Sequence, residues 1–206
     1  AYKALGNQKY LDIALQNAHF IIKNLWTSDG NLFHNYKNGK SSINGYLEDY
    51  CFVIAAFISL YEATLNEKWL HDAKQLMDYS LDHFYDDKKS LFAFTSNLDE
   101  ALITTHYETE DNVIPASNSV MAKNLLQLSI YFNNSYYEQV SHQMLLAILP
   151  GIDYPSAFSN WMDLALNYLE QNKELAVCGE QALEYCTKIN NLYIPNIVLA
   201  GSQKKS

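Results

Sequence analysis

The sequence predicts a mainly α-helical protein whose helical hairpins stack in two layers, as in an (α/α)6 toroid, with a small C-terminal α/β appendage. The first observation behind this is an internal repeat: residues 10–36 match residues 69–95 at an offset of 59, and a weaker copy starts near Tyr137. The second is an alternation of helices with one apolar face and helices that are apolar nearly all round. The third is a change of character near residue 172.

Each full copy of the repeat begins with an amphipathic helix. Apolar residues keep helical spacing in the first copy at Leu11, Ala14, Ala18, Ile21, Ile22 and Leu25, and in the second at Leu70, Ala73, Leu76, Met77, Leu81 and Phe84. Between and after these helices lie segments 47–61, 120–132 and 161–169, which are apolar nearly all round. Pro115 and Pro155 precede the last two and indicate helix starts.

The alternation predicts an inner layer of buried helices shielded by an outer layer of amphipathic ones. Closing the stack into a ring gives a toroid, whereas an open solenoid would show the same alternation. About three hairpins fit into the chain, which is half of a six-hairpin ring.

Residues 1–172 are therefore predicted to form a partial (α/α) barrel, and residues 173–206 a small α/β tail. Within the tail we expect a strand at 174–179, a helix at 181–190 and a second strand at 197–200. The opening AYKALG resembles the end of a helix and the tail stops abruptly, so we expect a fragment of a longer protein.

Composition excludes several classes of function. The formal charge of −9 argues against nucleic-acid binding, and no apolar run is long enough to cross a membrane. The three cysteines, Cys51, Cys178 and Cys186, lack metal-site spacing, and no signal peptide is visible, so we expect a cytoplasmic protein with reduced thiols. No metal motif and no glycine-rich phosphate loop is found, so we predict no metal and no cofactor.

The candidate site lies where the inner helices begin. Alternate helices of such a stack run parallel, so the N-termini of the inner helices share one face with the long connections 26–44, 85–114 and 150–155. Carboxylates beside aromatic rings suit work on carbohydrates, with one carboxyl group as general acid and another as base or nucleophile. We predict the catalytic residues Glu48, Asp49 and Asp111, and the substrate-binding residues His34, Tyr36, Tyr50, Ser117 and Asn118.

Structural explanations of the same residues remain open. Glu48 and Asp49 would also stabilise the positive end of a helix dipole without doing any chemistry. Ser117 and Asn118 are residue types that cap helices or hydrogen-bond between them. His34 would equally fit an exposed loop.

Three motifs, in order, give the chain a family resemblance. The stretch GYLEDYCFVIAAFISLYEAT, the stretch DNVIPASNSVMAKNLLQL and the tail ELAVCGEQALEYCTKINNLYIPNIVLAGS resemble the barrel part of the spermatogenesis-associated protein 20 family. The resemblance carries to the EDY motif at Glu48, Asp49 and Tyr50, and to the D-x-x-x-P-x-x-N-S motif, which supplies Asp111, Pro115, Asn118 and Ser119. At Ser117 the family often has glycine.

The resemblance implies a six-hairpin barrel similar to N-acylglucosamine 2-epimerases and six-hairpin glycosidases, and an N-terminal thioredoxin-like domain of the same protein as a partner. Those epimerases use histidine pairs with arginine, whereas the predicted inner helices lack histidine and the chain has no arginine. We therefore predict a carbohydrate-active or carbohydrate-binding domain with a sugar or small-molecule ligand, glycosidase-like or isomerase/epimerase-like if it is an enzyme. The alternative is a noncatalytic scaffold that serves the thioredoxin-like domain.

Overall fold

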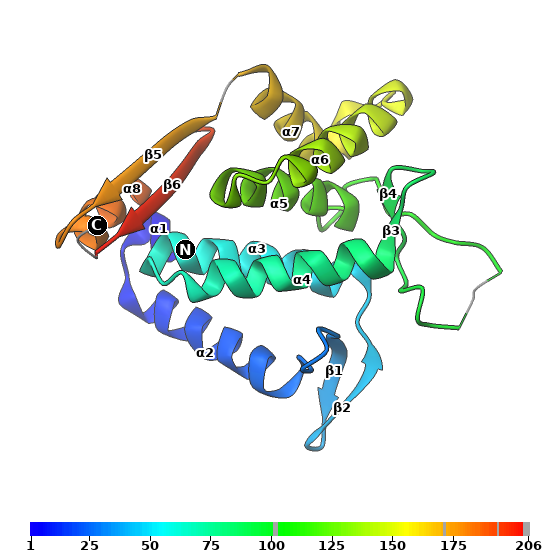
Figure 1. Cartoon of the computed structure of the whole chain (residues 1–206), viewed down its shortest axis with the longest axis horizontal. Helices are drawn as coiled ribbons and strands as arrows, with labels where there is room; N and C mark the ends of the chain where they lie inside the picture. The colour runs from blue at the N-terminus through cyan, green and yellow to red at the C-terminus, as the bar shows by residue number, and fades with distance from the viewer. Residues whose placement is uncertain (101–102, 171, 193, 204–206) are drawn as a thin grey trace.

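The computed structural model describes residues 1–100, 103–170, 172–192 and 194–203. Most of these residues belong to helices, which pair into hairpins (Figure 1). A small α/β unit lies at one end of the helices, and loops with short strands lie at the other. This is the mainly α hairpin arrangement that the sequence predicts.

The helices form an inner and an outer layer. The helices predicted to be buried form the inner layer: α3 (Leu47–Thr64), α5 (Ser117–Phe132) and α7 (Ser159–Leu169). The amphipathic helices form the outer layer: α2 (Gln8–Asn24), α4 (Lys68–Phe84) and α6 (Ser135–Ile148). Helix α5 contacts α3 on one side and α7 on the other, while α4 packs on α3 and α6 packs on α5.

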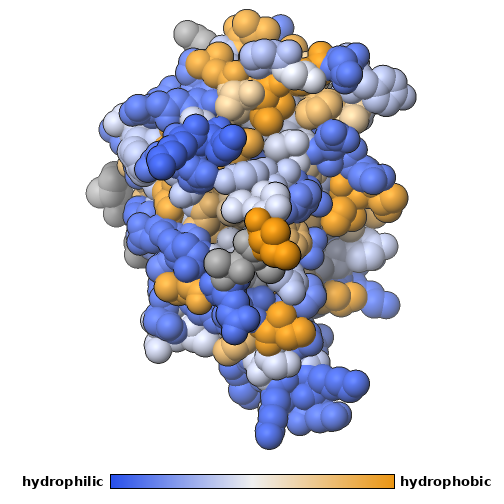
Figure 2. Space-filling model, turned by 90° about the vertical axis from the view of Figure 1, so that its right-hand side faces the viewer, coloured by the Kyte–Doolittle hydropathy of each residue, from blue (hydrophilic) through white to orange (hydrophobic). Residues whose placement is uncertain are grey.

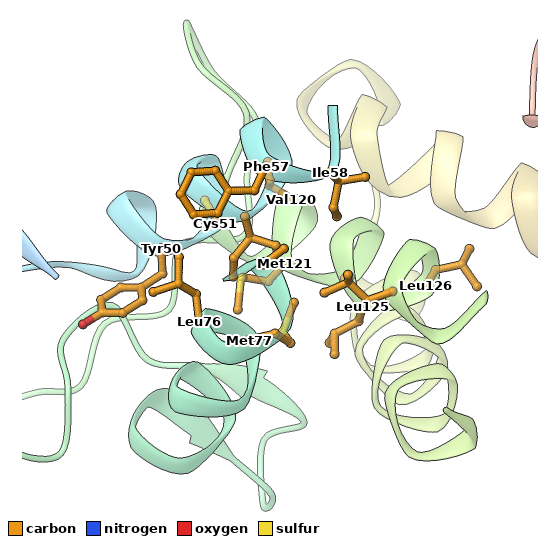
Figure 3. Packing of buried hydrophobic residues seen from close by; sticks show 14 of the residues in the cluster. Tyr50, Cys51, Phe57, Ile58, Leu76, Met77, Val120, Met121, Leu125 and Leu126 are labelled. Atoms are coloured by element: carbon orange, nitrogen blue, oxygen red, sulfur yellow. The ribbon is translucent and has the colours of Figure 1, made fainter. Parts of the chain in front are cut away.

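The core lies where α3, α4 and α5 meet (Figure 3). Fully buried side chains come from all three helices: Tyr50, Cys51 and Phe57, then Leu76 and Met77, then Met121 and Leu125. Each large apolar side chain buried in this way contributes about 1.5–3 kcal/mol relative to exposure. One polar bond crosses the core, from Asn124 Nδ2 to the carbonyl oxygen of Cys51 at 2.8 Å, and fixes α5 against α3.

Helix α7 differs from the prediction that it is buried all round. Trp161 and Leu164 are fully buried, whereas Leu166 is 52% exposed and Leu169 is 80% exposed. The helix is last in the stack, so within the described chain only one of its sides receives a neighbouring inner helix.

The turn from an inner to an outer helix has a recurring form. The residue that follows α3, Leu65, has the left-handed conformation with φ 55°, and so does Asn133 after α5, with φ 48°. In both cases the next residue is asparagine, and its side chain accepts hydrogen bonds from the first amides of the outer helix, as Asn134 Oδ1 does from Tyr136 N at 3.0 Å. These caps satisfy amides that a helix start leaves free.

The connection 26–44, predicted as a loop, contains a β-hairpin. Strands β1 (Phe33–Lys37) and β2 (Lys40–Asn44) pair antiparallel around Asn38 and Gly39, both of which have positive φ. Asn-Gly between two short runs is a strong hairpin signal, so the sequence held the information that would have identified it. The hairpin matters because it carries His34 and Tyr36.

Shorter elements occupy the other connections. Strands β3 (Tyr85–Asp86) and β4 (Leu91–Phe92), of two residues each, pair antiparallel. The 3-10 helices η1 (Leu149–Gly151) and η2 (Pro155–Phe158) lead into α7. A one-turn helix, α1 (Tyr2–Leu5), precedes α2. Part of the predicted loop 85–114, residues 101–102, lies outside the described residues.

The tail is a strand–helix–strand unit, close to the predicted boundaries. Strands β5 (Lys173–Cys178) and β6 (Ile197–Ser202) pair in parallel and are joined through α8 (Ala182–Asn190). The tail covers the C-terminal end of α3, where the backbone of Gly201 bonds the Tyr61 hydroxyl. Residues 204–206 of the predicted tail are outside the described part, and the division at residue 172 stays a prediction.

None of the helices in the described residues combines the length and the hydropathy needed to cross a bilayer.

Candidate functional site

The N-termini of α3, α5 and α7 lie at one end of the stack, as the sequence predicts for parallel inner helices. Hydrogen bonds from the intervening loop join them: Leu47 N donates to Phe94 O at 2.9 Å, and Asp111 N donates to Ala157 O at 2.7 Å. We call this end the rim. Seen from this side the surface is mostly hydrophilic, with scattered hydrophobic residues (Figure 2).

Asp49 fixes the start of α3. Its Oδ2 atom accepts the backbone N–H of Tyr46 at 2.9 Å, the reciprocal bond of a capping box. The same oxygen lies 2.9 Å from Nδ1 of His34, which β1 presents from the hairpin. Asp49 therefore combines two tasks, capping a helix and orienting an exposed imidazole.

Glu48, the residue before Asp49, is the rim carboxylate whose pKa is perturbed. Partial burial is the largest cause and raises the pKa, and the negative charges of Asp49 and Glu108 raise it further, while His34 lowers it. A carboxyl group whose pKa is raised above its ordinary range is suited to act as a general acid.

Glu108 is a rim residue that our predicted set omitted. Its Oε2 atom accepts the backbone N–H of Ser117 at 3.0 Å, at the first residue of α5. A carboxylate oxygen that accepts this N–H caps the start of α5. The sequence offers Glu108, Glu110 and Asp111 within four residues, and nothing in their spacing indicates which one turns toward α3.

The loop that holds Glu108 is anchored on both sides. The hydroxyl of the preceding residue, Tyr107, donates to Asp86 Oδ2 at 2.6 Å, and this bond raises the pKa of Tyr107 to about 12. The carbonyl oxygen of Glu108 accepts Asn118 Nδ2 at 3.0 Å. These bonds fix the backbone on each side of the carboxylate.

Asp111 is engaged by two inner helices. Its Oδ1 atom accepts the N–H of Ala116 and the hydroxyl of Ser119, each at 2.9 Å, just before and within α5. Its Oδ2 atom accepts the N–H of Asn160 at 2.8 Å, in the first turn of α7. Both oxygens therefore serve to hold α5 and α7 in register, and the geometry supports a positioning role.

Three predicted substrate-binding residues lie beneath the surface: Tyr50, Ser117 and Asn118 are all fully buried. The Tyr50 hydroxyl accepts Leu32 N at 2.8 Å and donates to Asn31 Oδ1 at 3.1 Å. Asn118 bonds both the N–H and the carbonyl oxygen of Phe92. These two side chains bond neighbouring groups beneath the rim, whereas the buried Ser117 hydroxyl has no hydrogen-bond partner among the described residues. The predicted role of all three in substrate binding stays a prediction.

The predicted binding residues His34 and Tyr36 are exposed. His34 begins a row of rings along the rim: it lies 5.1 Å from Tyr46, which stacks 5.0 Å from Phe94, which lies 5.9 Å from His106. Tyr36 leans the other way and meets Phe20 of α2 edge-on at 5.2 Å. His34 is therefore at the carboxylates, and Tyr36 stands apart from them.

Within the described parts of the chain, no three His, Cys, Asp or Glu side chains are grouped so that they could hold a metal ion.

The chain is similar to several known proteins. The family model of glycosyl hydrolase family 76 matches residues 1–111, just over half of the chain. Spermatogenesis-associated protein 20 of Homo sapiens is 27% identical over 212 residues, and that of Rattus norvegicus is 28% identical over 216 residues. The alignments cover 95% and 97% of this chain and 27% of each relative. The resemblance expected from the motifs is confirmed, and the chain spans about a quarter of the length of these curated relatives.

A solved structure agrees with the fold. The GH76 α-mannanase of Bacteroides thetaiotaomicron, as a selenomethionine derivative, superposes with a TM-score of 0.64 at 12% sequence identity, covering 92% of this chain and 52% of that one. At this identity the likeness concerns the fold alone, and it confirms the (α/α) toroid type of hairpin stack.

Proposed function

The chain belongs to glycosyl hydrolase family 76, and on that basis we propose that it carries the acid and base groups of a glycoside-hydrolysing (α/α) barrel. The observation that carries the proposal is Glu48, a carboxyl group at the start of an inner helix whose pKa is raised by burial and by two neighbouring carboxylates. Helix termini need no such group for capping, because Asp49 already performs that task.

The proposed chemistry uses two carboxyl groups in different environments. Glu48, whose pKa is raised, acts as the general acid and donates a proton to the glycosidic oxygen as the bond to the leaving sugar breaks. Glu108, which accepts the first N–H of α5, acts either as the base that activates the attacking water or as the nucleophile at the sugar carbon.

The remaining rim residues position these two. Asp49 orients His34, whose exposed ring is placed to bond a sugar hydroxyl. Asp111 and Asn118 hold α5, α7 and the loop of Glu108 together. This assignment keeps Glu48 from the predicted catalytic set, adds Glu108, and gives Asp49 and Asp111 supporting roles.

For the substrate we propose a neutral α-linked mannoside. The structural neighbour is an α-mannanase by its title. The rim supplies carboxylates, and the chain contains no arginine, the residue suited to bidentate binding of phosphate. We further propose that the protein is cytoplasmic, in keeping with three free cysteines, and that a thioredoxin-like domain of the same protein is its partner.

A thermal-shift screen on the full-length protein tests this function. We expect α-mannobiose to raise the melting temperature, whereas mannose 6-phosphate does not. The substitution His34→Ala should weaken the shift, and Glu67→Gln, just before α4 at the opposite end of the stack, should leave it unchanged. Absence of a shift with every sugar, in a protein that melts cooperatively, would reject the carbohydrate site.

One observation favours the alternative, a noncatalytic scaffold. Such a scaffold would use its rim carboxylates for helix capping, and Asp49 and Asp111 are engaged in this way. Glu48 separates the two functions, because a scaffold gains nothing from a carboxyl group whose ionisation is disfavoured. In a scaffold Glu48→Gln would leave every measured activity of the full-length protein intact.

A further inference from the structure

An apolar groove runs between α2 and α3, far from the rim chemistry. It has a volume of about 470 Å³, and α1 closes one end of it. One wall is the side of α2 from Tyr10 to Ile21, and the other is the side of α3 from Val53 to Ala63. The groove is about 15 Å long, because ten residues of α3 rise by 1.5 Å each.

The walls of the groove expose apolar side chains. On α2, Ile13 is 53% exposed and Tyr10 is 41% exposed. On α3, Ala56 and Ser59 are exposed in the middle of a helix that is otherwise among the most buried of the described chain. An exposed apolar strip along two helices indicates a surface that another element covers.

The packing of the other hairpins shows what is missing here. Each outer helix packs most extensively on the inner helix that precedes it: α4 on α3, and α6 on α5. Its contact with the inner helix that follows is slight, as for α4 with α5 and α6 with α7. Helix α2 contacts the inner helix that follows it, α3, only slightly, as α4 contacts α5. The groove lies where an inner helix preceding α2 would pack.

Helix α1 has the geometry of the last turn of an inner helix. It ends at Gly6 with φ 64°, and Gly6 N donates to Tyr2 O at 2.8 Å, as Leu65 N donates to Tyr61 O at 2.7 Å at the end of α3. Asn7 follows and its side chain accepts Lys9 N at 3.0 Å, the same cap that Asn66 provides for α4. The residues align at the offset of 59 that relates the two copies of the repeat.

We propose that this groove receives an apolar helix of the same polypeptide, and that α1 is its last turn. Helix α1 enters the end of the groove through Tyr2 and Lys3. The Lys3 ammonium pairs with Glu62, a carboxylate that is only 8% exposed, and thereby fixes the end of the proposed helix against α3. The interface continues the α3–α5–α7 series by one more inner helix.

A proline substitution tests the continuity of the helix in the full-length protein. A helix that begins at Tyr2 tolerates proline there, since its first amides have no partner, but a helix that runs through Tyr2 loses a hydrogen bond and gains a steric clash. We expect Tyr2→Pro to lower the melting temperature by several degrees and Tyr2→Ala to lower it less. Equal melting of the two variants would overturn the proposal.

Cysteine labelling tests whether the groove is covered. Ser59→Cys, on the groove wall, is compared with Gln16→Cys, on the exposed face of α2, in a Cys178→Ser background that removes the exposed native thiol. In the native full-length protein we expect maleimide to react on the order of tenfold more slowly at Ser59→Cys, with equal rates in urea. Tyr2→Pro should speed the slow reaction.

Two results would contradict the assignment. Equal native rates at the two cysteines would mean that the groove is open. Slow labelling that becomes fast when a dimer is diluted to monomers would mean that a second copy, rather than a helix of the same chain, covers it.

Discussion

Nδ1 of His34 lies 2.9 Å from Oδ2 of Asp49, and that same oxygen accepts the N–H of Tyr46 at 2.9 Å. One carboxylate oxygen thus ties a hairpin to the first turn of α3. The neighbouring carboxyl group, Glu48, is left out of the capping arrangement and keeps a raised pKa. Adjacent acids in the sequence therefore have different physical roles, and this division underlies the predictions below.

Removing the carboxylate of Asp49 should destabilise the protein. Asp49→Ala leaves the Tyr46 amide without its acceptor, and the loss of a helix-start cap costs about 1–2 kcal/mol. Asp49→Asn keeps an acceptor oxygen and should cost less than half as much. Urea unfolding measures both, with the exposed His34→Ala as a control for the hairpin contact. An Asp49→Ala variant as stable as the wild type would contradict the capping role.

Replacing Glu48 should stabilise the protein at neutral pH. Its pKa in the folded state is raised above the ordinary value of a glutamate, so ionisation of Glu48 lowers the stability of the folded state as the pH rises above the unfolded-state pKa. Glu48→Gln removes this cost, which we expect to be less than about 1 kcal/mol because the group is partly exposed. The gain in stability should be present at pH 7 and largely vanish near pH 3.5, where Glu48 is mostly protonated in both the folded and the unfolded state. A gain that is larger at low pH would be inconsistent with a raised pKa.

Asp111 should matter more for stability than an exposed acid does. Asp111→Ala removes acceptors from the amides of Ala116 and Asn160, and two lost charge-assisted bonds cost about 2–4 kcal/mol. Asp111→Asn keeps only one of the two acceptor oxygens, because its amide nitrogen cannot accept a hydrogen bond. Asp153→Ala, at an exposed position, is the control and should change the unfolding midpoint little. Equal effects of the two alanine variants would remove the positioning role.

The chain passes very close to itself just before α3, at Gly45. A methyl group there would lie 2.9 Å from the carbonyl oxygen of Leu32 and 3.2 Å from the ring of Tyr50. Gly45→Ala should therefore cost about 1–3 kcal/mol through overpacking. Gly151→Ala, where no atom lies within 4 Å, should be nearly neutral in the same thermal denaturation. The comparison isolates the close contact from the general effect of replacing glycine.

The helical architecture could be predicted from the sequence because the buried faces of helices determine the periodicity of apolar residues. Helix α5 is apolar nearly all round because other elements pack around it, and α2 and α4 are amphipathic because they face water on one side. The prediction for α7 was wrong because its apolar outer face, at Leu166 and Leu169, lacks a cover within the described chain. An apolar pattern in the sequence therefore predicts a helix that can pack on several sides, but it does not show which sides are covered.

The candidate site was harder to predict because residue type says nothing about which hydrogen bonds a side chain makes. Asn118 and Tyr50 have the chemistry of binding residues, but backbone groups of Phe92 and Leu32 use it. The charge of Glu108 acts on Glu48 of α3, and Tyr107 and Asn118 fix the loop of Glu108; such contacts depend on the folded chain. The position of the rim follows from topology, whereas the roles of its members follow from three-dimensional contacts.

Glycoside hydrolysis by the full-length protein tests the central claim most directly. The measurement is the rate of release of reducing sugar from α-mannobiose by the wild type, by Glu48→Gln and by the control Glu67→Gln. We predict measurable hydrolysis that Glu48→Gln lowers by about 10²–10⁴-fold, the usual contribution of a general acid, and that Glu67→Gln leaves unchanged. Hydrolysis that Glu48→Gln does not slow, or its absence in a wild type that binds no sugar, would contradict the account.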